Sequence, residues 1–163
     1  MIEIPKGDGR RIHLDYSRTF FIDLGPIKNA IPIDDGIMPI AYGFVIGTKG
    51  KEAGENDELD ALLYSKKSFN VGDRTRASPI AVLNLENNDH KVVFTDDSAI
   101  KSWKDLPQKD RELLLKYFGY KSSIKKVDDK TEALRLIQEC VTDKPLPIPK
   151  IVRIVKEKTK EKI

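Results

Sequence analysis

Short runs of β-prone residues, separated by turns, dominate the first 95 residues of the chain. Turn-forming residues such as Gly7-Asp8-Gly9 lie between the runs, and residues 24–40 have the Gly, Pro and Asp content of a loop. The predicted strands cover residues 2–4, 11–16, 19–22, 41–46, 59–64, 74–85 and 90–95, and Pro79 interrupts the longest of them. This part of the chain is therefore predicted to be β structure.

The pattern changes after residue 97, where apolar residues recur at helical spacing. The first predicted helix covers residues 107–118, with Gly119 at the position where a helix would end. Asp128 or Asp129 could cap a second helix, whose apolar positions are Ala133, Leu134, Leu136, Ile137 and Cys140. Strands first and helices last favour an α+β fold, a closed or twisted antiparallel sheet flanked by two helices.

Charge is unevenly distributed along the 163 residues, which suffice for one domain, or one domain with a tail. Residues 144–163 contain seven Lys or Arg and two Glu, a net charge of +5, so residues 1–143 carry −2 of the total +3. We expect a folded domain over 1–143 and a basic C-terminal extension over 144–163. The extension is either a solvated end that packs briefly and then frays, or a weak contact for polyanions.

The composition narrows the partners and the compartment. A basic tail on a slightly acidic body does not favour a nucleic-acid surface, which would spread basic residues over a folded face. No apolar run approaches the roughly 18 residues of a membrane span, and the first residues resemble no signal peptide. Cys140 is the only cysteine, which excludes an internal disulfide. We expect a cytoplasmic protein without membrane or nucleic-acid partners.

Carboxylates gather at two points near predicted strands. Four occur in the six residues Glu55-Asn56-Asp57-Glu58-Leu59-Asp60, which lead into the strand at 59–64. They form either a solvated acidic loop or, if the chain bends at 57–58, a group that converges on a hard divalent cation such as Mg²⁺. The second group, Glu86-Asn87-Asn88-Asp89, precedes His90-Lys91 and is typical of either a turn or a site for a metal-bound anion.

Other chemistries lack their sequence signals. The segment Gly47–Lys51 does not have the spacing of a phosphate-binding P-loop. Two His and one Cys are a poor basis for a zinc centre. No G-x-S-x-G nucleophile motif occurs.

Six short motifs, in order from residue 2 to about residue 140, resemble the soluble family I inorganic pyrophosphatases. They are Ile2-Glu3-Ile4-Pro5, Tyr42-Gly43-Phe44-Val45, Glu55-Asn56-Asp57-Glu58-Leu59-Asp60, Pro79-Ile80-Ala81-Val82-Leu83, Asp105-Leu106-Pro107 and Tyr117-Phe118-Gly119-Tyr120-Lys121. The resemblance implies a five-stranded antiparallel barrel resembling an OB-fold, flanked by two helices. It also implies Mg²⁺-dependent hydrolysis of pyrophosphate to two phosphates, with Mn²⁺ or Zn²⁺ as other candidate ions, by a homo-oligomer, often a hexamer.

The same resemblance implies roles for individual residues. Asp57 would activate the attacking water, and Asp60 would bridge two metal ions. The implied metal ligands are Glu55, Asp60, Asp89, Glu86 and Glu3. The implied phosphate contacts are Arg11, Tyr42, Lys91, Tyr120 and Lys121.

Several positions depart from the family pattern. Glu55, Asn56 and Glu58 replace aspartate, glycine and proline of the signature, and His13 replaces a glutamate. Leu24 stands near the position of a phosphate-binding arginine, for which Lys28 could substitute. Two hypotheses follow: a divergent Mg²⁺-dependent pyrophosphatase, or a protein of the same fold with an impaired site that binds anions or serves a structural role.

Overall fold

A mixed six-stranded sheet lies at the centre of the computed structural model, which describes residues 1–50 and 57–157. Its strands, in spatial order, are β1 (Ile2–Ile4), β4 (Ala41–Phe44), β5 (Asp60–Tyr64), β7 (Lys91–Thr95), β6 (Ser78–Leu85) and β8 (Ile124–Asp128). All neighbours pair antiparallel except β5 and β7, which are parallel. The parallel pair brings the first residues of β5 and β7 to the same edge of the sheet.

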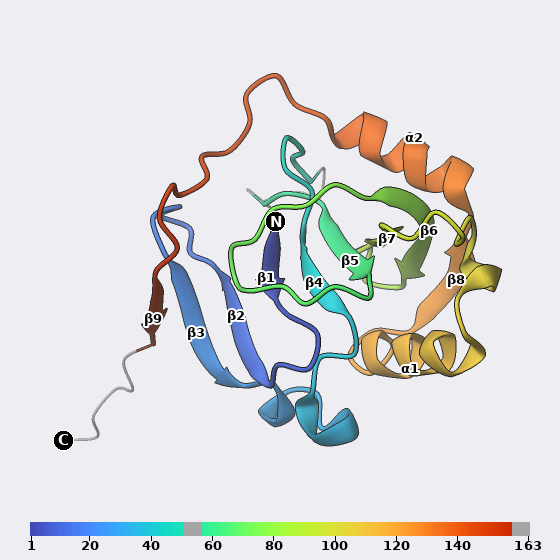
Figure 1. Cartoon of the computed structure of the whole chain (residues 1–163), viewed down its shortest axis with the longest axis horizontal. Helices are drawn as coiled ribbons and strands as arrows, with labels where there is room; N and C mark the ends of the chain where they lie inside the picture. The colour runs from blue at the N-terminus through green and yellow to red at the C-terminus, as the bar shows by residue number, and fades with distance from the viewer. Residues whose placement is uncertain (51–56, 158–163) are drawn as a thin grey trace.

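A second, three-stranded sheet lies beside the first (Figure 1). The hairpin of β2 (Arg10–Leu14) and β3 (Phe21–Pro26) pairs antiparallel, and β9 (Ile154–Lys156) runs parallel to β3 at its outer edge. The two sheets meet at β1 and β2, where the Leu14 N–H donates to Glu3 Oε2 at 2.8 Å. Residues 154–156 of the C-terminal extension thus pair with β3 through their backbone, while the side chains of Ile154 and Val155 remain exposed.

The sheet differs from the expected five-stranded antiparallel barrel. It contains six strands, one pair is parallel, and no pairing among the residues that the structure describes joins its end strands β1 and β8. Residues 65–77 connect β5 to β6, and β6 lies beyond β7 in the sheet. β7 then lies between them, antiparallel to β6 and parallel to β5. β8 then extends the sheet beyond β6.

Both predicted helices are confirmed: α1 (Gln108–Phe118) and α2 (Lys130–Cys140). Asp129 caps α2, because its side chain accepts the Glu132 N–H at 3.1 Å. Ala133 and Cys140 of α2 are buried against Val82 and Val92, so this helix covers one face of β6 and β7. Three short 3₁₀ turns complete the elements: η1 (Ile27–Asn29), η2 (Ile33–Gly36) and η3 (Trp103–Asp105).

The main core lies between the two sheets and α1. Phe21, Leu62, Ile80 and Leu83 are almost fully buried there, and each such side chain stabilises the fold by about 1.5–3 kcal/mol. Gly43 permits a close approach of β4 to the N-terminus, since a Cβ at this position would lie 1.9 Å from the Met1 carbonyl oxygen. This packing holds β1, β4 and β5 in one rigid layer.

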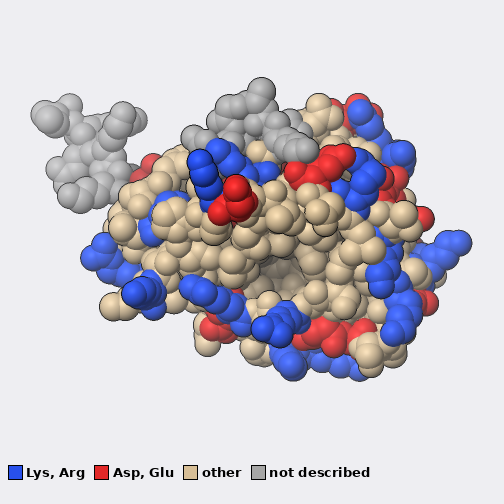
Figure 2. Space-filling view, turned by 90° about the horizontal axis from the view of Figure 1, so that it is seen from above, with Lys and Arg blue, Asp and Glu red and all other residues tan. Residues whose placement is uncertain are grey.

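Charged residues of both signs are interspersed on the surface. Seen from above, the molecule has a central hollow, with Lys and Arg side chains lying among Asp and Glu around it (Figure 2). None of the helices in the described ranges has the length and hydropathy to cross a membrane.

Candidate active site

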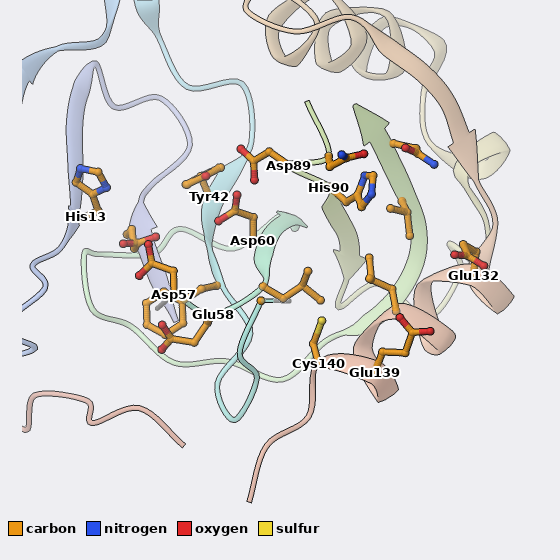
Figure 3. Close-up of a pocket in the computed structure, with 18 of the residues that line it drawn as sticks. His13, Tyr42, Asp57, Glu58, Asp60, Asp89, His90, Glu132, Glu139 and Cys140 are labelled. Carbon is orange, nitrogen blue, oxygen red and sulfur yellow. The ribbon is translucent and has the colours of Figure 1, made fainter. Parts of the chain in front are cut away.

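A cavity of about 470 Å³ opens between the strand ends of the six-stranded sheet, the β2–β3 turn and α2 (Figure 3). Carboxylates dominate its polar lining: Glu3, Asp57, Glu58, Asp60, Asp89, Asp128, Glu132 and Glu139. Arg18 and Arg135 are the cationic side chains that line it. The structure thus brings together acidic residues that are distant in the sequence.

Asp60 and Lys91 begin the parallel strands β5 and β7 and lie directly opposite each other. The Lys91 Nζ lies 3.0 Å from Asp60 Oδ2 and 3.2 Å from Asp89 Oδ2, so one ammonium group joins two carboxylates. Tyr42 Oη lies 3.5 Å from the same Nζ, which also lies 5.3 Å from the Tyr42 ring centroid. We call Lys91, Asp60 and Asp89 the Lys91 cluster. Figure 3 shows Asp60 and Asp89 pointing toward one another beside Tyr42.

Burial determines the electrostatics of the Lys91 cluster. Burial raises the pKa of Asp60; the Lys91 charge opposes this shift, and the Asp89 charge adds to it. Burial alone would lower the pKa of Lys91, but Tyr42, Asp60 and Asp89 outweigh it and raise that pKa. The lysine is therefore always charged, whereas the two carboxylates repel each other and favour a further cation.

Glu3 is a third carboxylate at this site, only 7% exposed, on β1. Burial raises its pKa to about 8, and the charges of Asp60 and Asp57 add to the shift. Only the Leu14 N–H, which donates to Oε2, opposes it. An ionised Glu3 therefore needs an additional positive charge nearby.

Arg18 forms a second cationic centre in the lining of the larger cavity. Its guanidinium pairs with Glu58 at hydrogen-bonding distance, and Nη1 lies 3.9 Å from Asp57 Oδ1. The guanidinium also lies 5.7 Å from the centroid of the Phe44 ring. We call Arg18, Asp57 and Glu58 the Arg18 cluster. Glu58 is buried, whereas the Asp57 side chain is 52% exposed and accessible from the cavity.

A smaller cavity of about 240 Å³ adjoins the first and shares His13, Tyr42 and Asp89 with it. Four of the predicted phosphate-binding residues line it: Arg11, Tyr42, Lys91 and Lys121. The carboxylate-lined cavity and the cavity that contains Arg11, Lys91 and Lys121 therefore adjoin at His13, Tyr42 and Asp89. An anion in the smaller cavity would lie beside the Lys91 cluster.

The structure does not bring every predicted residue to the cavities. Glu86 has a 58% exposed side chain that lies 3.9 Å from Lys125 Nζ, and it lines neither cavity. Tyr120 is 52% exposed and also lines neither. Lys28 is exposed on η1, so it does not occupy the place of the arginine absent at Leu24. Glu55 lies outside the described residues.

Sequence reasoning missed several residues that line the cavities. Glu132, Leu136, Glu139 and Cys140 lie on one face of α2, and their spacing is the helical signal that could have revealed them. Tyr117, from α1, lines the smaller cavity. Its Oη and the Nδ1 of His90 are buried without a hydrogen-bond partner among the residues described. Nothing in the sequence near Arg18 indicates its position.

The donor set fits Mg²⁺ in one particular way. Within residues 1–50 and 57–157, no three His, Cys, Asp or Glu side chains are arranged to hold an ion together. Asp60 and Asp89 nevertheless form a close pair of oxygen donors, joined through Lys91 Nζ. Mg²⁺ is commonly held by one or two carboxylates, with waters and substrate phosphates completing its octahedron. The pair therefore suits Mg²⁺ bound together with a phosphate ligand.

Comparison with known proteins agrees with this arrangement. The family model described as inorganic pyrophosphatase matches residues 1–144. An inorganic pyrophosphatase of Thermoplasma volcanium is 28% identical over 136 residues, 77% of this chain and 76% of the relative. One of Gluconobacter oxydans is 26% identical over 164 residues, 86% of this chain and 87% of the relative.

Solved structures show the same fold. The crystal structure of inorganic pyrophosphatase from Ehrlichia chaffeensis superposes with a TM-score of 0.74 at 24% identity, over 86% of this chain and 90% of that one. The enzyme from Neisseria gonorrhoeae superposes with a TM-score of 0.70 over 86% of both chains. With its acidic cavity beside a cation-lined one, and with the family model matching nearly all of its folded part, this chain belongs to the inorganic pyrophosphatase family.

Proposed function

We propose that this protein hydrolyses inorganic pyrophosphate to two phosphates in a Mg²⁺-dependent reaction. The observation that supports this most is Lys91, whose ammonium group joins Asp60 and Asp89 at the boundary of the two cavities. Pyrophosphate is a compact polyanion that repels nucleophiles. A site for its hydrolysis needs carboxylates that hold cations on one side and cationic side chains that hold phosphate on the other.

In this proposal Asp60 and Asp89 hold the metal, and buried Glu3 supplies a further carboxylate close to it. Bound Mg²⁺ would screen the phosphate charge and acidify a coordinated water. Asp57, half exposed to the cavity, accepts a proton from the attacking water. Arg11, Lys91 and Lys121 hold the phosphates and stabilise the charge on the leaving group. Tyr42 is half-buried beside Lys91; burial keeps its pKa well above the ordinary value, and its hydroxyl oxygen accepts a hydrogen bond from Lys91 Nζ at 3.5 Å.

Three further assignments rest on the resemblance alone. We assign Glu55 and Glu86 to additional metal ions and Tyr120 to a phosphate contact. Glu86 and Tyr120 would have to turn toward the cavities, because both side chains point elsewhere in the present structure.

We extend the proposal to the organisation of the protein. Residues 1–143 would form the catalytic domain and 144–163 a basic extension. The catalytic domain would act as a cytoplasmic homo-oligomer, with a hexamer as the first candidate.

The test is phosphate release from pyrophosphate by the purified protein, with and without Mg²⁺. We expect Mg²⁺-dependent release, and a fall of at least about 100-fold in Asp57→Asn, because the substitution removes the group that accepts the proton. Asp143→Asn is the matched control, since Asp143 is exposed and lines neither cavity. Equal rates of phosphate release in Asp57→Asn and the parent would contradict the proposal.

The second candidate function is anion binding without turnover. It is favoured by Leu24 at an arginine position of the family and by His13, which lines both cavities where the family has a glutamate. Absence of phosphate release with Mg²⁺, Mn²⁺ or Zn²⁺ from correctly folded protein, together with saturable pyrophosphate binding, would favour this candidate.

A further inference from the structure

The chain beyond the region matched by the family model returns to the β2–β3 turn, whose Arg18 lines the larger cavity. Figure 1 shows the segment after α2 passing over the molecule to β9, beside β3. We call residues 145–157 the strap. Its Pro147 carbonyl oxygen accepts a hydrogen bond from Arg18 Nε at 2.9 Å, across 129 residues of sequence. The same arginine pairs with Glu58 and Asp57, so the strap and the acidic segment share one side chain.

Arg18 holds an unusual position on the β2–β3 turn. Its backbone has φ of 62°, a left-handed conformation that is uncommon for residues with a side chain. The turn is held by the Arg18 N–H, which donates to Asp15 O at 2.8 Å, and by the Ser17 N–H, which donates to Asp15 Oδ2 at 3.1 Å. This turn directs the guanidinium between the strap and Glu58, where only 11% of the side chain remains exposed.

The strap is anchored along the residues that follow the contact with Arg18. Ile148 packs against the main core. Further along, the Phe21 N–H donates to Arg153 O at 2.8 Å, and the Glu157 N–H donates to Asp23 O at 3.1 Å. The Arg153 guanidinium lies 5.5 Å from the Phe20 ring centroid. These contacts fix the strap along β3 and so fix the Pro147 carbonyl above the turn.

The acidic segment has a second anchor, on the other side of Asp57. The Gly50 N–H donates to Asp57 O at 2.8 Å. Thr48, almost fully buried, accepts the Leu59 N–H through Oγ1 at 3.0 Å. Thr48 is paired with Val141, the residue after α2. These hydrogen bonds fix the Asp57 backbone. Among the residues described, Arg18 is the one cationic group that forms an ion pair with the Asp57 side chain.

We propose that Arg18 is a positioning residue for Asp57 and that the strap is part of the catalytic machinery, because it orients Arg18. The proposal rests on the proposed role of Asp57. Arg18 donates from Nε to Pro147, and its two terminal nitrogens face Glu58 and Asp57. Only the planar fork of arginine can serve all three partners at once. The strap thereby gives the reaction a positioning contact that the matched family domain does not contain.

The test compares three single variants in the full chain. Arg18→Lys keeps the charge but loses the fork, and we expect kcat to fall roughly 10-fold with little change in KM, because misplacement of a catalytic group slows chemistry more than binding. Ile148→Ala, which loosens the strap next to Pro147, should lower kcat several-fold. Ile151→Ala is the matched control, since Ile151 is 79% exposed on the same strap.

The double variant Arg18→Lys/Ile148→Ala tests whether the strap acts through Arg18 or independently of it. If the strap acts through Arg18, Ile148→Ala lowers kcat no further once Arg18 is replaced. If the losses of kcat in the two single variants multiply in the double variant, the proposal is overturned. Unchanged kcat in both single variants would overturn it as well. A large rise in KM with unchanged kcat in Arg18→Lys would also overturn it, because that result assigns Arg18 to direct phosphate binding.

Amide hydrogen exchange gives a readout independent of hydrolysis. Exchange over residues 57–64 should become faster in Arg18→Lys and Ile148→Ala but not in Ile151→Ala. Unchanged exchange in both variants would overturn the proposal even if the parent hydrolyses pyrophosphate. If the parent lacks activity but exchange is faster in both variants than in the parent, the result supports the strap contact and counts against the proposed function alone.

Discussion

Two clusters of similar charge contribute carboxylates to the same cavity, and they are held in different ways. Each places one cation between two carboxylates: Lys91 between Asp60 and Asp89, and Arg18 between Asp57 and Glu58. The Lys91 cluster depends on direct pairing of neighbouring strands, since Asp60 and Lys91 face each other in the β5–β7 register. The Arg18 cluster depends on a turn, a loop and a strap that are distant in sequence.

The difference indicates a division of labour. The Lys91 cluster lies on the sheet, borders both cavities and has the composition of a site for metal and phosphate. The Arg18 cluster encloses one buried ion pair and leaves Asp57 accessible from the cavity. Strands can hold ligands at fixed spacing, whereas a turn and a loop allow the proposed general base to be adjusted separately.

The largest expected effect is a loss of activity when the Lys91 cluster is disrupted. Lys91→Met should lower kcat/KM at least about 100-fold, because it removes a buried cation from beside the proposed phosphate site. Lys125→Met is the matched control, since Lys125 lies outside both cavities and contacts only Glu86 among the ion pairs of the described chain. Steady-state kinetics measure both variants. Similar losses in the two would remove the distinction between Lys91 and a surface lysine.

A smaller effect separates the clusters by stability. Glu58→Gln should reduce the free energy of unfolding by about 2 kcal/mol, since it leaves the nearly buried Arg18 guanidinium with only the more distant, half-exposed Asp57 as an anionic partner. Glu86→Gln, in which the substituted side chain is 58% exposed, should change it by less than about 0.5 kcal/mol. Urea unfolding measures both. An unchanged free energy of unfolding in Glu58→Gln would show that the Arg18 cluster is not held by its ion pair.

The smallest effect concerns pH and the third carboxylate, Glu3. Its pKa is about 8 in the folded protein against an ordinary 4.5, so between these values the folded state binds more protons than the unfolded state. The free energy of unfolding of the metal-free protein should therefore decrease as pH rises through this window, by about 1 kcal/mol per pH unit for this group.

Glu3→Gln isolates this contribution, because Asp60 also has a raised pKa and adds to the same trend. The variant can still accept the Leu14 N–H and should show a shallower decrease between pH 6 and 7 in chelator. Urea unfolding at the two pH values measures the slopes. Identical slopes for the parent and Glu3→Gln would show that Glu3 is not the buried, protonated carboxyl described above.

The fold could be predicted from the sequence where the signal is local. The strand runs and the two helices appear within a few residues of their predicted positions, because side-chain periodicity reports which face is buried. β8 was missed, since Ile124-Lys125-Lys126-Val127-Asp128 contains only two apolar residues and forms a strand by pairing with β6. The parallel pairing of β5 and β7 was missed as well, because it depends on the path of residues 65–77 rather than on either strand.

The site depended more on the family resemblance than on local signals. The resemblance assigned Asp60, Asp89 and Lys91 to one site, and the structure places Lys91 Nζ within hydrogen-bonding distance of both carboxylates. Glu86 and Tyr120 were expected beside them but lie outside the cavities, since neighbouring residues of turns and strand ends point in different directions. Arg18 carried no signal at all. Its partners Glu58 and Pro147 lie 40 and 129 residues away in the chain.

The sequence by itself determined the family, the order of the main elements and the residue types available for metal and phosphate, because these depend on composition and on spacing over a few residues. The tertiary structure alone decided which carboxylates share a cation, which predicted ligands face the cavity, and that the C-terminal extension reaches the acidic segment. Those outcomes depend on distances between segments far apart in the chain, and only the packing of the two sheets, α2 and the strap sets these distances.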